Sequence, residues 1–426
     1  MKVKIVTSKR GSYLQPIGES PSPATALVRS GKERQTIVGF GGAFTESAAH
    51  VYATMDKEIK EKAIALYFGK DGLRYNIGRT TIGSCDFSHS DYDYAAKDDL
   101  SDFSLSHDEK EILPLIKDAE REAGFKLPIL SSTWSPLAKW KDNGDKCHGG
   151  RLKEECYGLH AAYLARYVKE MRSLGFDVAA LTIQNEPEAI QTWESCLYTP
   201  EQEARLANIL HSLLPETRLY IWDHNRDRLP ERAIETLAHC DSGAVYGIAY
   251  HWYDRNRFDL LEKTYEELKM PLLFSEGCIE TVNQADFGGM GDYSSLTRYA
   301  RNYLRDLNAG STGFIDWNLF LDMSGGYNHV GNLCEAPIMS DGKSLRINPS
   351  YYGIKHLSAY LEKGAKVYKA EFEDPSLSAA FAINPNGTKV AIVLNEGERK
   401  TAGVDFAGDE AKVDLEPGQI ATLIFE

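Results

Sequence analysis

The segment VAALTIQNEP, residues 178–187, has six nearly continuously apolar positions followed at once by polar ones. A strand that is apolar on both faces is typical of a parallel sheet covered by helices, because neither face then meets water. Side chains that follow such a strand gather at the carboxyl edge of the sheet. The segment therefore predicts a buried parallel strand with polar groups at that edge.

Seven further short apolar segments share this pattern, and amphipathic helical patterns separate them. The candidate strands cover residues 37–44, 73–79, 127–132, 178–184, 218–223, 245–252, 271–276 and 313–318. The helical patterns cover residues 56–68, 108–123, 157–174, 200–214, 232–239, 259–268 and 296–307. Eight βα units need about 250 residues, and the stretch from 37 to 307 is slightly longer. The predicted fold class is therefore α/β, with a (β/α)8 TIM barrel.

A doubly wound open sheet is the alternative architecture. It would bind a dinucleotide through a glycine fingerprint after its first strand. The early glycine cluster GFGG, residues 39–42, lacks the third glycine of that fingerprint. We therefore interpret the cluster as close backbone packing where the barrel begins.

The two ends of the chain have a different pattern. Period-2 strands are predicted at residues 379–383, 389–394 and 419–425, with turns such as NPNG between them. Residues 3–7 and 24–29 are also strand-like. We expect both ends to form one small β-sandwich beside the barrel, with residues 1–30 and 355–426 in the sandwich and 31–354 in the barrel.

Composition excludes several classes of function. The 426 residues carry 48 Lys and Arg against 62 Asp and Glu, a net charge of -14, and no basic run exceeds two residues, so we expect no nucleic-acid partner. No window approaches the roughly 20 apolar residues that cross a bilayer, so stable membrane insertion is not expected. Seven scattered cysteines without a C-x-x-C pair, and an N-terminus without a signal-peptide core, predict a cytoplasmic protein with reduced thiols.

Two carboxylates stand at the ends of predicted strands. Glu186 follows the segment quoted above, and Glu276 ends the run PLLFSE, residues 271–276. Burial raises a carboxyl pKa, and two facing carboxyls push each other's pKa values apart. Glycoside hydrolysis needs such a pair, because one group protonates the leaving oxygen while the other attacks the anomeric carbon. Either residue alone is equally well explained as a turn cap or a surface ion pair, but their shared barrel face favours catalysis.

Aromatic and polar residues recur at the other strand ends. Aromatic faces pack against the C–H surface of a sugar, and fixed polar groups bind its hydroxyls. The candidates are Asp86, Trp134, Trp140, His251, Trp252, Tyr253, Asp316, Trp317 and Asn318. Each has a purely structural explanation as core, cap or buried histidine, but packing does not explain why these groups recur at strand ends.

Eight short motifs carry a family resemblance. They are GFGGAFTES (39–47), RYNIGR (74–79), SCDFS (84–88), QNEPE (184–188), HWY (251–253), SEG (275–277), DWNL (316–319) and GGYNHVGN (325–332). In this order, over residues 37 to 338, they resemble the retaining β-glycosidases of glycoside hydrolase family 30, the glucosylceramidase group. The resemblance implies a double displacement through a covalent glycosyl-enzyme, with Glu186 as acid/base and Glu276 as nucleophile. It also implies that the first sugar is surrounded by Asp86, Asn185, Tyr253, Trp317 and Asn332.

One loop departs from the family pattern. The family usually places a tryptophan a few residues before an Asn-Gly pair, whereas Lys139 stands there and Trp140 follows. Because this loop helps to recognise the sugar's 4- and 6-hydroxyls in the family, the exact sugar is left open. We expect β-glucosides, with an ionised Asp86 that accepts hydrogen bonds from two hydroxyls; the alternatives are a β-1,6-glucanase, a β-xylosidase or a β-fucosidase. The expected partner is thus a small-molecule or oligosaccharide β-glycoside.

Other hydrolase classes lack their signatures. None of the 11 histidines forms a His-x-His motif, so no metal ion and no cofactor are expected for the reaction. A Gly-x-Ser-x-Gly elbow is also absent. The alternative from another class is a carbohydrate-binding protein without catalysis, because sequence alone does not fix the spacing of Glu186 and Glu276.

Overall fold

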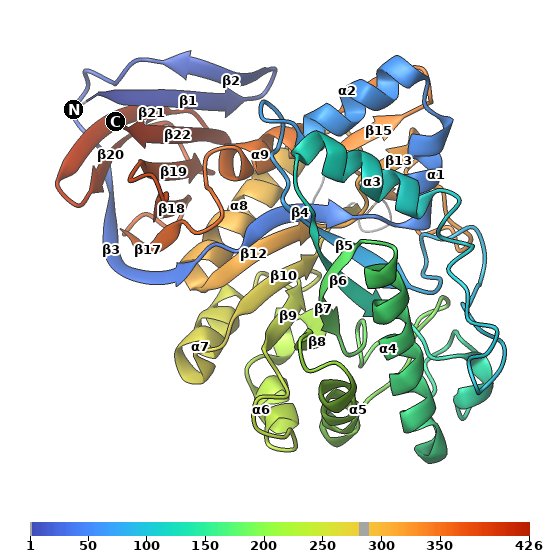
Figure 1. Cartoon of the computed structure of the whole chain (residues 1–426). Coiled ribbons are helices and arrows are strands. Elements are labelled where there is room, and N and C mark those ends of the chain that lie inside the picture. Colours follow the sequence, from blue (N-terminus) through green and yellow to red (C-terminus); the bar gives the residue numbers. More distant parts are fainter. Residues whose placement is uncertain (1, 281–288) are drawn as a thin grey trace.

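Eight parallel strands close into a barrel in the computed structural model, which describes residues 2–280 and 289–426 (Figure 1). Every neighbouring pair of barrel strands is parallel. The TIM-barrel prediction is confirmed, and each predicted strand overlaps one barrel strand. In order around the barrel these are β4 (Gly39–Ala43), β5 (Ile77–Ile82), β6 (Pro128–Thr133), β7 (Asp177–Thr182), β8 (Arg218–Asn225), β9 (Gly247–His251), β10 (Leu272–Glu276) and β12 (Ser311–Asp316).

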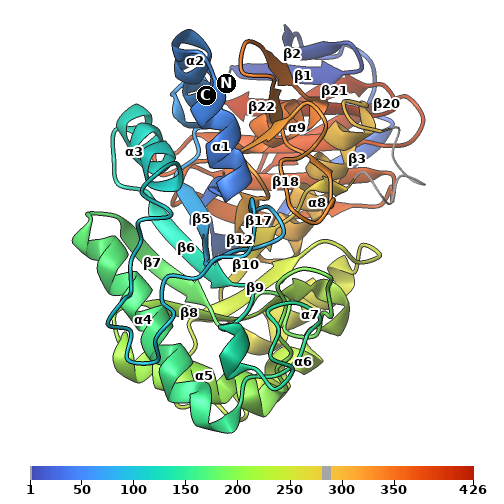
Figure 2. The same ribbon diagram turned by 90° about the vertical axis from the view of Figure 1, so that its right-hand side faces the viewer.

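Helices surround the barrel (Figures 1 and 2). The seven predicted helical patterns correspond to α2 (Lys57–Phe68), α3 (Ile112–Ala123), α4 (Tyr157–Ser173), α5 (Pro200–Leu213), α6 (Glu231–Leu237), α7 (Phe258–Leu268) and α8 (Ser294–Ala309). Two more, α1 (Glu46–Thr54) and α9 (Pro349–Ser358), were not predicted. Helix α1 buries Glu46 and Ser47 along with its apolar residues, which removes the amphipathic pattern. None of the described helices is both long and apolar enough to cross a membrane.

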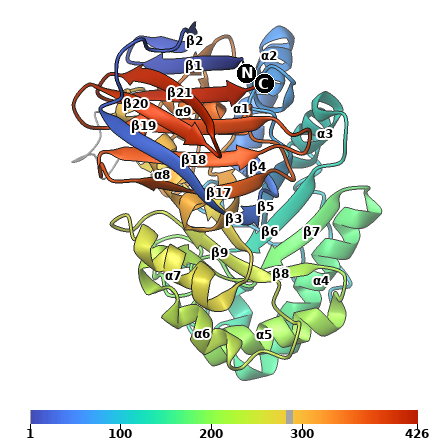
Figure 3. The same cartoon turned by 90° about the vertical axis from the view of Figure 1, so that its left-hand side faces the viewer.

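The chain ends meet in one sheet beside the barrel (Figure 3). Strand β1 pairs antiparallel with β22, so that Val3 lies opposite Phe425. In sheet order the nine strands are β2 (Ser12–Ile17), β1 (Val3–Lys9), β22 (Gln419–Phe425), β19 (Lys389–Asn395), β18 (Leu377–Ile383), β17 (Lys366–Phe372), β3 (Ala26–Thr36), β20 (Lys400–Phe406) and β21 (Asp409–Leu415).

This sheet curls around a core of its own, which gives the sandwich-like unit expected from the sequence. The ring of Phe406 on β20 lies 5.0 Å from Phe381 and 6.3 Å from Phe425, centroid to centroid. Helix α8 joins the sheet to the barrel, because Arg305 donates to the hydroxyl of Ser378 and to the carbonyl of Leu377. The sheet is therefore attached to the barrel through α8.

Two small strand pairings extend the loops above the barrel. Strand β11 (Ile279–Glu280) pairs with β14 (Cys334–Glu335), and β13 (Phe320–Asp322) lies beside β15 (Ile338–Ser340) and β16 (Leu345–Ile347). They carry the chain from β10 and β12 over the carboxyl mouth, where the polar strand ends converge. Their strands of two or three residues are too short for a period-2 pattern to predict.

The glycine cluster at the start of the barrel is explained by close backbone contact. A Cβ on Gly41 would lie 2.1 Å from the carbonyl oxygen of Ile77 on the neighbouring strand, and one on Gly42 would lie 2.6 Å from Leu319. A backbone oxygen fixed in a barrel ladder cannot move aside as a flexible side chain does. Strand β4 can therefore join the barrel only without a side chain at position 41.

Substitution Gly41→Ala should accordingly destabilise the protein by about 1–3 kcal/mol, the usual range for overpacking a core. The matched control is Gly158→Ala, an exposed position in α4 where a Cβ meets no atom within 4 Å. That variant should be slightly more stable, because alanine favours a helix. Chemical denaturation of both variants measures the two changes, and an unchanged or raised stability for Gly41→Ala would contradict the packing argument.

Candidate active site

A pocket of about 170 Å³ opens at the carboxyl ends of the barrel strands. This volume admits roughly a dozen water-sized positions, which suits a single hexose. Its lining is polar and aromatic and consists of Asp86, Trp134, Asn185, Glu186, Gln191, Trp193, His224, Asn225, Tyr253, Glu276, Cys278, Glu280, Trp317, Asn332 and Cys334. All seven residues that the resemblance implied line this pocket, together with several that were not predicted.

A wider cavity of about 350 Å³ lies at the opposite mouth of the barrel. It is lined mainly by apolar residues such as Ile37, Ile77, Leu130 and Leu273, and its described lining includes no carboxylate. Reactive groups in these barrels lie at the carboxyl ends of the strands. The smaller pocket is therefore the candidate active site.

Arg79 on β5 lies at the centre of the polar network below the pocket and is fully buried. Its guanidinium donates to Glu276 Oε2 at 2.8 Å and to Asp223 Oδ2 at 2.9 Å. It also donates to Asn185 Oδ1 at 3.0 Å and to Ser132 Oγ at 3.1 Å. Because a buried charge is tolerated only with partners on all sides, this arrangement fixes the ends of several strands at once.

Glu276 ends strand β10 and faces the pocket with Oε1, which accepts a hydrogen bond from the Tyr253 hydroxyl at 3.1 Å. Burial raises the pKa of Glu276, and the charges of His251 and Arg79 offset only part of that rise. The hydrogen bonds from Arg79 and Tyr253 hold the Glu276 carboxylate in one orientation. A group held in this way is suited to attack a bound electrophile along a fixed line.

Glu186 has a strained backbone, with a φ of 48° in the left-handed region. Its amide donates to the carbonyl of Asp223 at 3.0 Å, which holds the residue in this conformation. Non-glycine residues in such conformations cluster at functional sites. The turn directs the Glu186 carboxylate towards two histidines, with Oε1 at 3.1 Å from His251 Nδ1 and at 3.5 Å from His224 Nδ1.

The imidazole of His251 lies between the two carboxylates. Its Nε2–H donates to Asp223 Oδ1 at 3.0 Å and lies 4.0 Å from Glu276 Oε2, while Nδ1 contacts Glu186. Burial lowers the pKa of His251, but the charge of Glu276 and the bonds to Asp223 and Glu186 raise it to about 9. The contact between His251 and Glu186 also acts on the carboxyl. Burial raises the pKa of Glu186, but His224 and His251 lower it overall.

A single proton therefore lies on the line between His251 Nδ1 and Glu186 Oε1. It can rest on the imidazole, with Glu186 ionised, or on Glu186, with the imidazole neutral. Asp223 fixes the ring in either case, because its carboxylate holds the Nε2 proton. Burial raises the pKa of Asp223, but Arg79 and His251 lower it well below its usual value, so Asp223 stays ionised.

The opposite wall of the pocket offers groups for a sugar. Asn332 donates its side-chain amide to Asp86 Oδ2 at 2.8 Å. Burial, followed by the charge of Glu276, raises the pKa of Asp86 to about 8. This raised pKa favours the protonated carboxyl at neutral pH, where the sequence led us to expect an ionised one, and a protonated carboxyl both donates to and accepts from sugar hydroxyls.

Trp134 and Trp317 form the aromatic part of this wall. Their rings stack at 5.2 Å with an interplanar angle of 20°, and the Arg79 guanidinium lies 4.9 Å from the Trp134 ring. The prediction that Trp140 lines the pocket is wrong. Its indole Nε1 donates to Asp98 at 2.8 Å, and its ring packs against Tyr163 on α4. The short 3-10 turn at Ala138–Trp140 directs the buried ring away from the pocket and against α4, whereas Trp134 lines the pocket.

Most of the other predicted site residues come together, but Trp252, Asp316 and Asn318 are buried outside the pocket lining. Asn185, Tyr253, Trp317 and Asn332 line the pocket with the two glutamates and Asp86, while His251 is fully buried just beneath them. Sequence reasoning missed Arg79, Asp223, His224 and Trp193. The signal for two of them was present, since the polar residues Asp223, His224 and Asn225 follow the apolar start of β8.

One group of pocket residues could in principle hold a metal ion. Ligand atoms of Glu186, His224 and His251 lie within 4.8 Å of one another. Both ring nitrogens of His251 are already engaged, however, by Asp223 and Glu186. This arrangement serves proton transfer without an ion.

Relatives of the chain are found both by sequence and by structure. The family model described as the glycosyl hydrolase family 30 TIM-barrel domain matches residues 37–361. The lysosomal acid glucosylceramidase of Mus musculus is 29% identical over 85% of this chain and 76% of that protein. Endo-1,6-beta-D-glucanase neg1 of Aspergillus fumigatus is 22% identical over 89% of this chain and 82% of that protein. The crystal structure of SrfJ from Salmonella typhimurium has a TM-score of 0.93 and 34% identity, and the match covers 100% of both chains.

The substitution Asp223→Asn tests the electrostatic origin of the proton on His251. Removing the carboxylate removes a charge that favours the protonated ring, so the pKa of His251 should fall from about 9 by about one unit or more. Nuclear magnetic resonance of protein labelled at the histidine nitrogens measures this titration. The control Asp98→Asn changes an exposed carboxylate that contacts Trp140. It should leave the pKa of His251 unchanged. An unchanged or raised pKa in Asp223→Asn would contradict the assignment.

Proposed function

Since the chain belongs to glycosyl hydrolase family 30, it is a retaining glycoside hydrolase, and we propose that it hydrolyses β-glucosides with Glu276 as nucleophile and Glu186 as acid/base. One observation carries this assignment of roles. The two carboxylates face the same pocket on either side of His251, and only Glu186 shares a proton with that imidazole. Glu276 is instead held by the fixed positive charge of Arg79.

In the first step a Glu276 oxygen attacks the anomeric carbon of the bound sugar. The C–O bond to the leaving group breaks, and the departing oxygen takes the proton shared by Glu186 and His251. Arg79 and Tyr253 hold the attacking carboxylate, which limits the reorganisation needed to reach the transition state. The products are a glycosyl ester on Glu276 and the free alcohol.

In the second step the roles of the same groups reverse. The ester on Glu276 carries no charge, and Glu276 is the largest of the charges that raise the pKa of His251. The pair of His251 and Glu186 then has one proton fewer, with Glu186 ionised and ready to accept a proton from water. Water attacks the anomeric carbon, the ester bond breaks, and the shared proton is restored. Two inversions give net retention.

The choice of glucose rests on two kinds of support. The pocket lining presents Asp86 and Asn332 as a hydrogen-bonded polar pair, together with the stacked rings of Trp134 and Trp317. A relative is named as a glucosylceramidase, and a more distant one as an endo-1,6-β-glucanase. Both names refer to a glucose unit, and the second also to a β-linkage. A β-1,6-glucan is therefore the second candidate substrate, ahead of β-xylosides and β-fucosides.

We also propose a cytoplasmic location for the enzyme. All seven cysteines are free thiols, including Cys278 and Cys334, whose sulfur atoms lie 3.1 Å apart in the pocket wall. Two buried thiols at this distance persist most readily in a reducing compartment. Fractionation of the native host cells would test this location.

Variants of the two glutamates should separate their roles. Glu276→Ala should be nearly inactive on every substrate and partly rescued by azide, which fills the space of the missing carboxylate. Glu186→Gln should lose about 100- to 10,000-fold in kcat/KM on alkyl glucosides, which need an acid, but far less on dinitrophenyl glucoside. Glu188→Gln, two residues further on and outside the pocket lining, is the matched control and should keep its activity. Equal losses on good and poor leaving groups in both glutamate variants would refute the assigned roles.

A panel of aryl β-glycosides tests the sugar. The wild type should prefer the glucoside over the xyloside, galactoside and fucoside, because Asp86 and Asn332 are placed to bind hydroxyls. Asp86→Ala should lose roughly 10- to 100-fold in kcat/KM on the glucoside and much less on the xyloside, which lacks the hydroxymethyl group. A wild-type preference for another sugar, or unchanged selectivity in the variant, would show that glucose is the wrong assignment.

A further inference from the structure

Three loops at the rim of the pocket bring together a second set of ligand-bearing side chains. Asp91 lies in the loop after β5, Glu194 in the loop after β7, and His329 in the segment between β13 and β14. His329 Nε2 lies 3.6 Å from Asp91 Oδ1 and 3.8 Å from Glu194 Oε2. One ligand atom of each lies within 4.8 Å of the other two. We refer to these three residues as the Glu194 cluster.

Glu194 is the unusual member of the cluster. It is only 1% exposed, and neither of its carboxylate oxygens makes a hydrogen bond of ordinary geometry within the described part of the chain, although Ser84 and Lys146 are among its polar neighbours. A buried carboxylate without such partners is strongly disfavoured. The nearby ammonium of Lys146 is already engaged, since it donates to Ser84 Oγ at 2.8 Å and to Asp93 Oδ1 at 3.0 Å. The environment of Glu194 therefore lacks a positively charged partner in direct contact.

His329 is oriented as a metal ligand would be. Its Nδ1–H donates to the carbonyl oxygen of Ser88 at 2.9 Å, which fixes the tautomer and leaves the lone pair on Nε2. That Nε2 is buried and has no hydrogen-bond partner in the described part of the chain, while it faces Asp91 and Glu194. A histidine held through one nitrogen by a carbonyl, with the other nitrogen aimed at carboxylates, is the usual arrangement around a bound metal ion.

We propose that Asp91, Glu194 and His329 bind a divalent metal ion of the zinc class. One imidazole and two carboxylates are a ligand set that zinc accepts, with metal–ligand distances of about 2.0–2.2 Å. In a tetrahedron of that size the ligand atoms are about 3.4 Å apart, close to the 3.6 and 3.8 Å separations here. The side chain of Asp91 is 53% exposed, which leaves an entry path and room for a water molecule as fourth ligand.

The ion would tie together the loops that form the sugar pocket. Asp91 is five residues from Asp86, Glu194 directly follows the pocket residue Trp193, and His329 is three residues before Asn332. The ion is separate from the reacting glutamates and takes no part in bond cleavage. Its role is to hold the rim, so that its loss affects stability and substrate affinity more than the chemical step.

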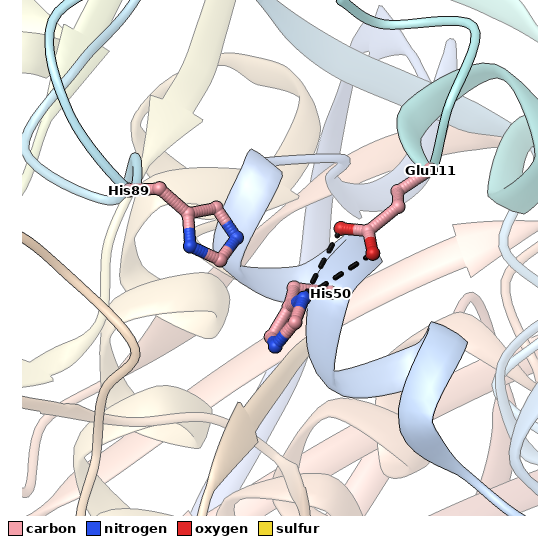
Figure 4. A group of neighbouring side chains, drawn as sticks. All are labelled: His50, His89 and Glu111. Carbon is pink, nitrogen blue, oxygen red and sulfur yellow. Dashed lines mark hydrogen bonds and ion pairs between the residues drawn. The ribbon is translucent and has the colours of Figure 1, made fainter.

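A second cluster outside the pocket provides an internal comparison. His50, His89 and Glu111 also bring ligand atoms within 4.8 Å of one another (Figure 4). There, however, His50 Nδ1 already lies 3.2 and 3.3 Å from the two oxygens of Glu111, and all three residues are partly exposed. The contact between His50 and Glu111 accounts for this cluster, and it contains no orphaned buried carboxylate.

Titration of metal-free protein with zinc chloride in a calorimeter tests the proposal, and thermal unfolding with and without zinc gives a second readout. The variants are Glu194→Gln, His329→Gln and Asp91→Asn; the last changes a half-exposed residue, so its folding is not at risk. Glu111→Gln is the matched control, since it removes one carboxylate from the comparison cluster. Cobalt in place of zinc reports direct coordination through its visible absorption spectrum.

We expect saturable binding of zinc by the wild type, with a raised unfolding temperature and a tetrahedral cobalt spectrum. Each of the three cluster variants should weaken that binding at least tenfold, and His329→Gln should lose the cobalt spectrum, whereas Glu111→Gln should match the wild type. Absence of saturable binding would overturn the proposal. Unchanged affinity in the cluster variants, or loss of binding in Glu111→Gln, would also overturn it, because the ion would then bind elsewhere.

Discussion

The buried guanidinium of Arg79 is the constraint on which the rest of the site depends. It joins β5 to the ends of β6, β8 and β10 and to the turn after β7, through Ser132, Asp223, Glu276 and Asn185. A charge without solvent needs all of these partners, and loss of one partner from a buried ion pair costs about 3–5 kcal/mol. The network therefore sets the relative positions of the strand ends before any substrate binds. In this sense the barrel and the active site are one structure.

The same network divides the two glutamates chemically. Arg79 gives Glu276 a permanent positive neighbour, whereas Glu186 faces the imidazole of His251, which can gain and lose a proton. Asp223 links the two halves, because it accepts from both Arg79 and His251. Two identical side chains thus acquire different roles from their partners, as occurs in other carboxylate pairs. The strained turn at Glu186 is stabilised by the same segment, because its backbone N–H donates a hydrogen bond to the carbonyl oxygen of Asp223.

Much of the fold could be predicted from sequence because the barrel strands contain short buried apolar runs and the seven predicted helices each have one apolar face. The glutamates could be predicted because they directly follow such strands. The buried network could not be predicted, because Arg79 lies within a strand and no sequence pattern shows that a charged residue there is buried. Trp140 was misplaced for a related reason: a 3-10 turn in a loop decides which of two tryptophans faces the pocket, and hydrophobic pattern does not fix that choice. The Glu194 cluster depends on three loops meeting in space, which no single segment reveals.

Identifying the residue that carries the sugar between the two steps is the most direct test of the mechanism. A 2-fluoro-β-glucoside with a good leaving group forms the glycosyl ester but hydrolyses slowly, because the fluorine destabilises the positively charged transition state. Digestion and mass spectrometry then locate the label. A sugar attached to Glu276, in the peptide that contains residues 272–276, is the predicted result. A label on Glu186 or Asp86, or turnover of a good substrate with no covalent species detected, would contradict the proposed double displacement through Glu276.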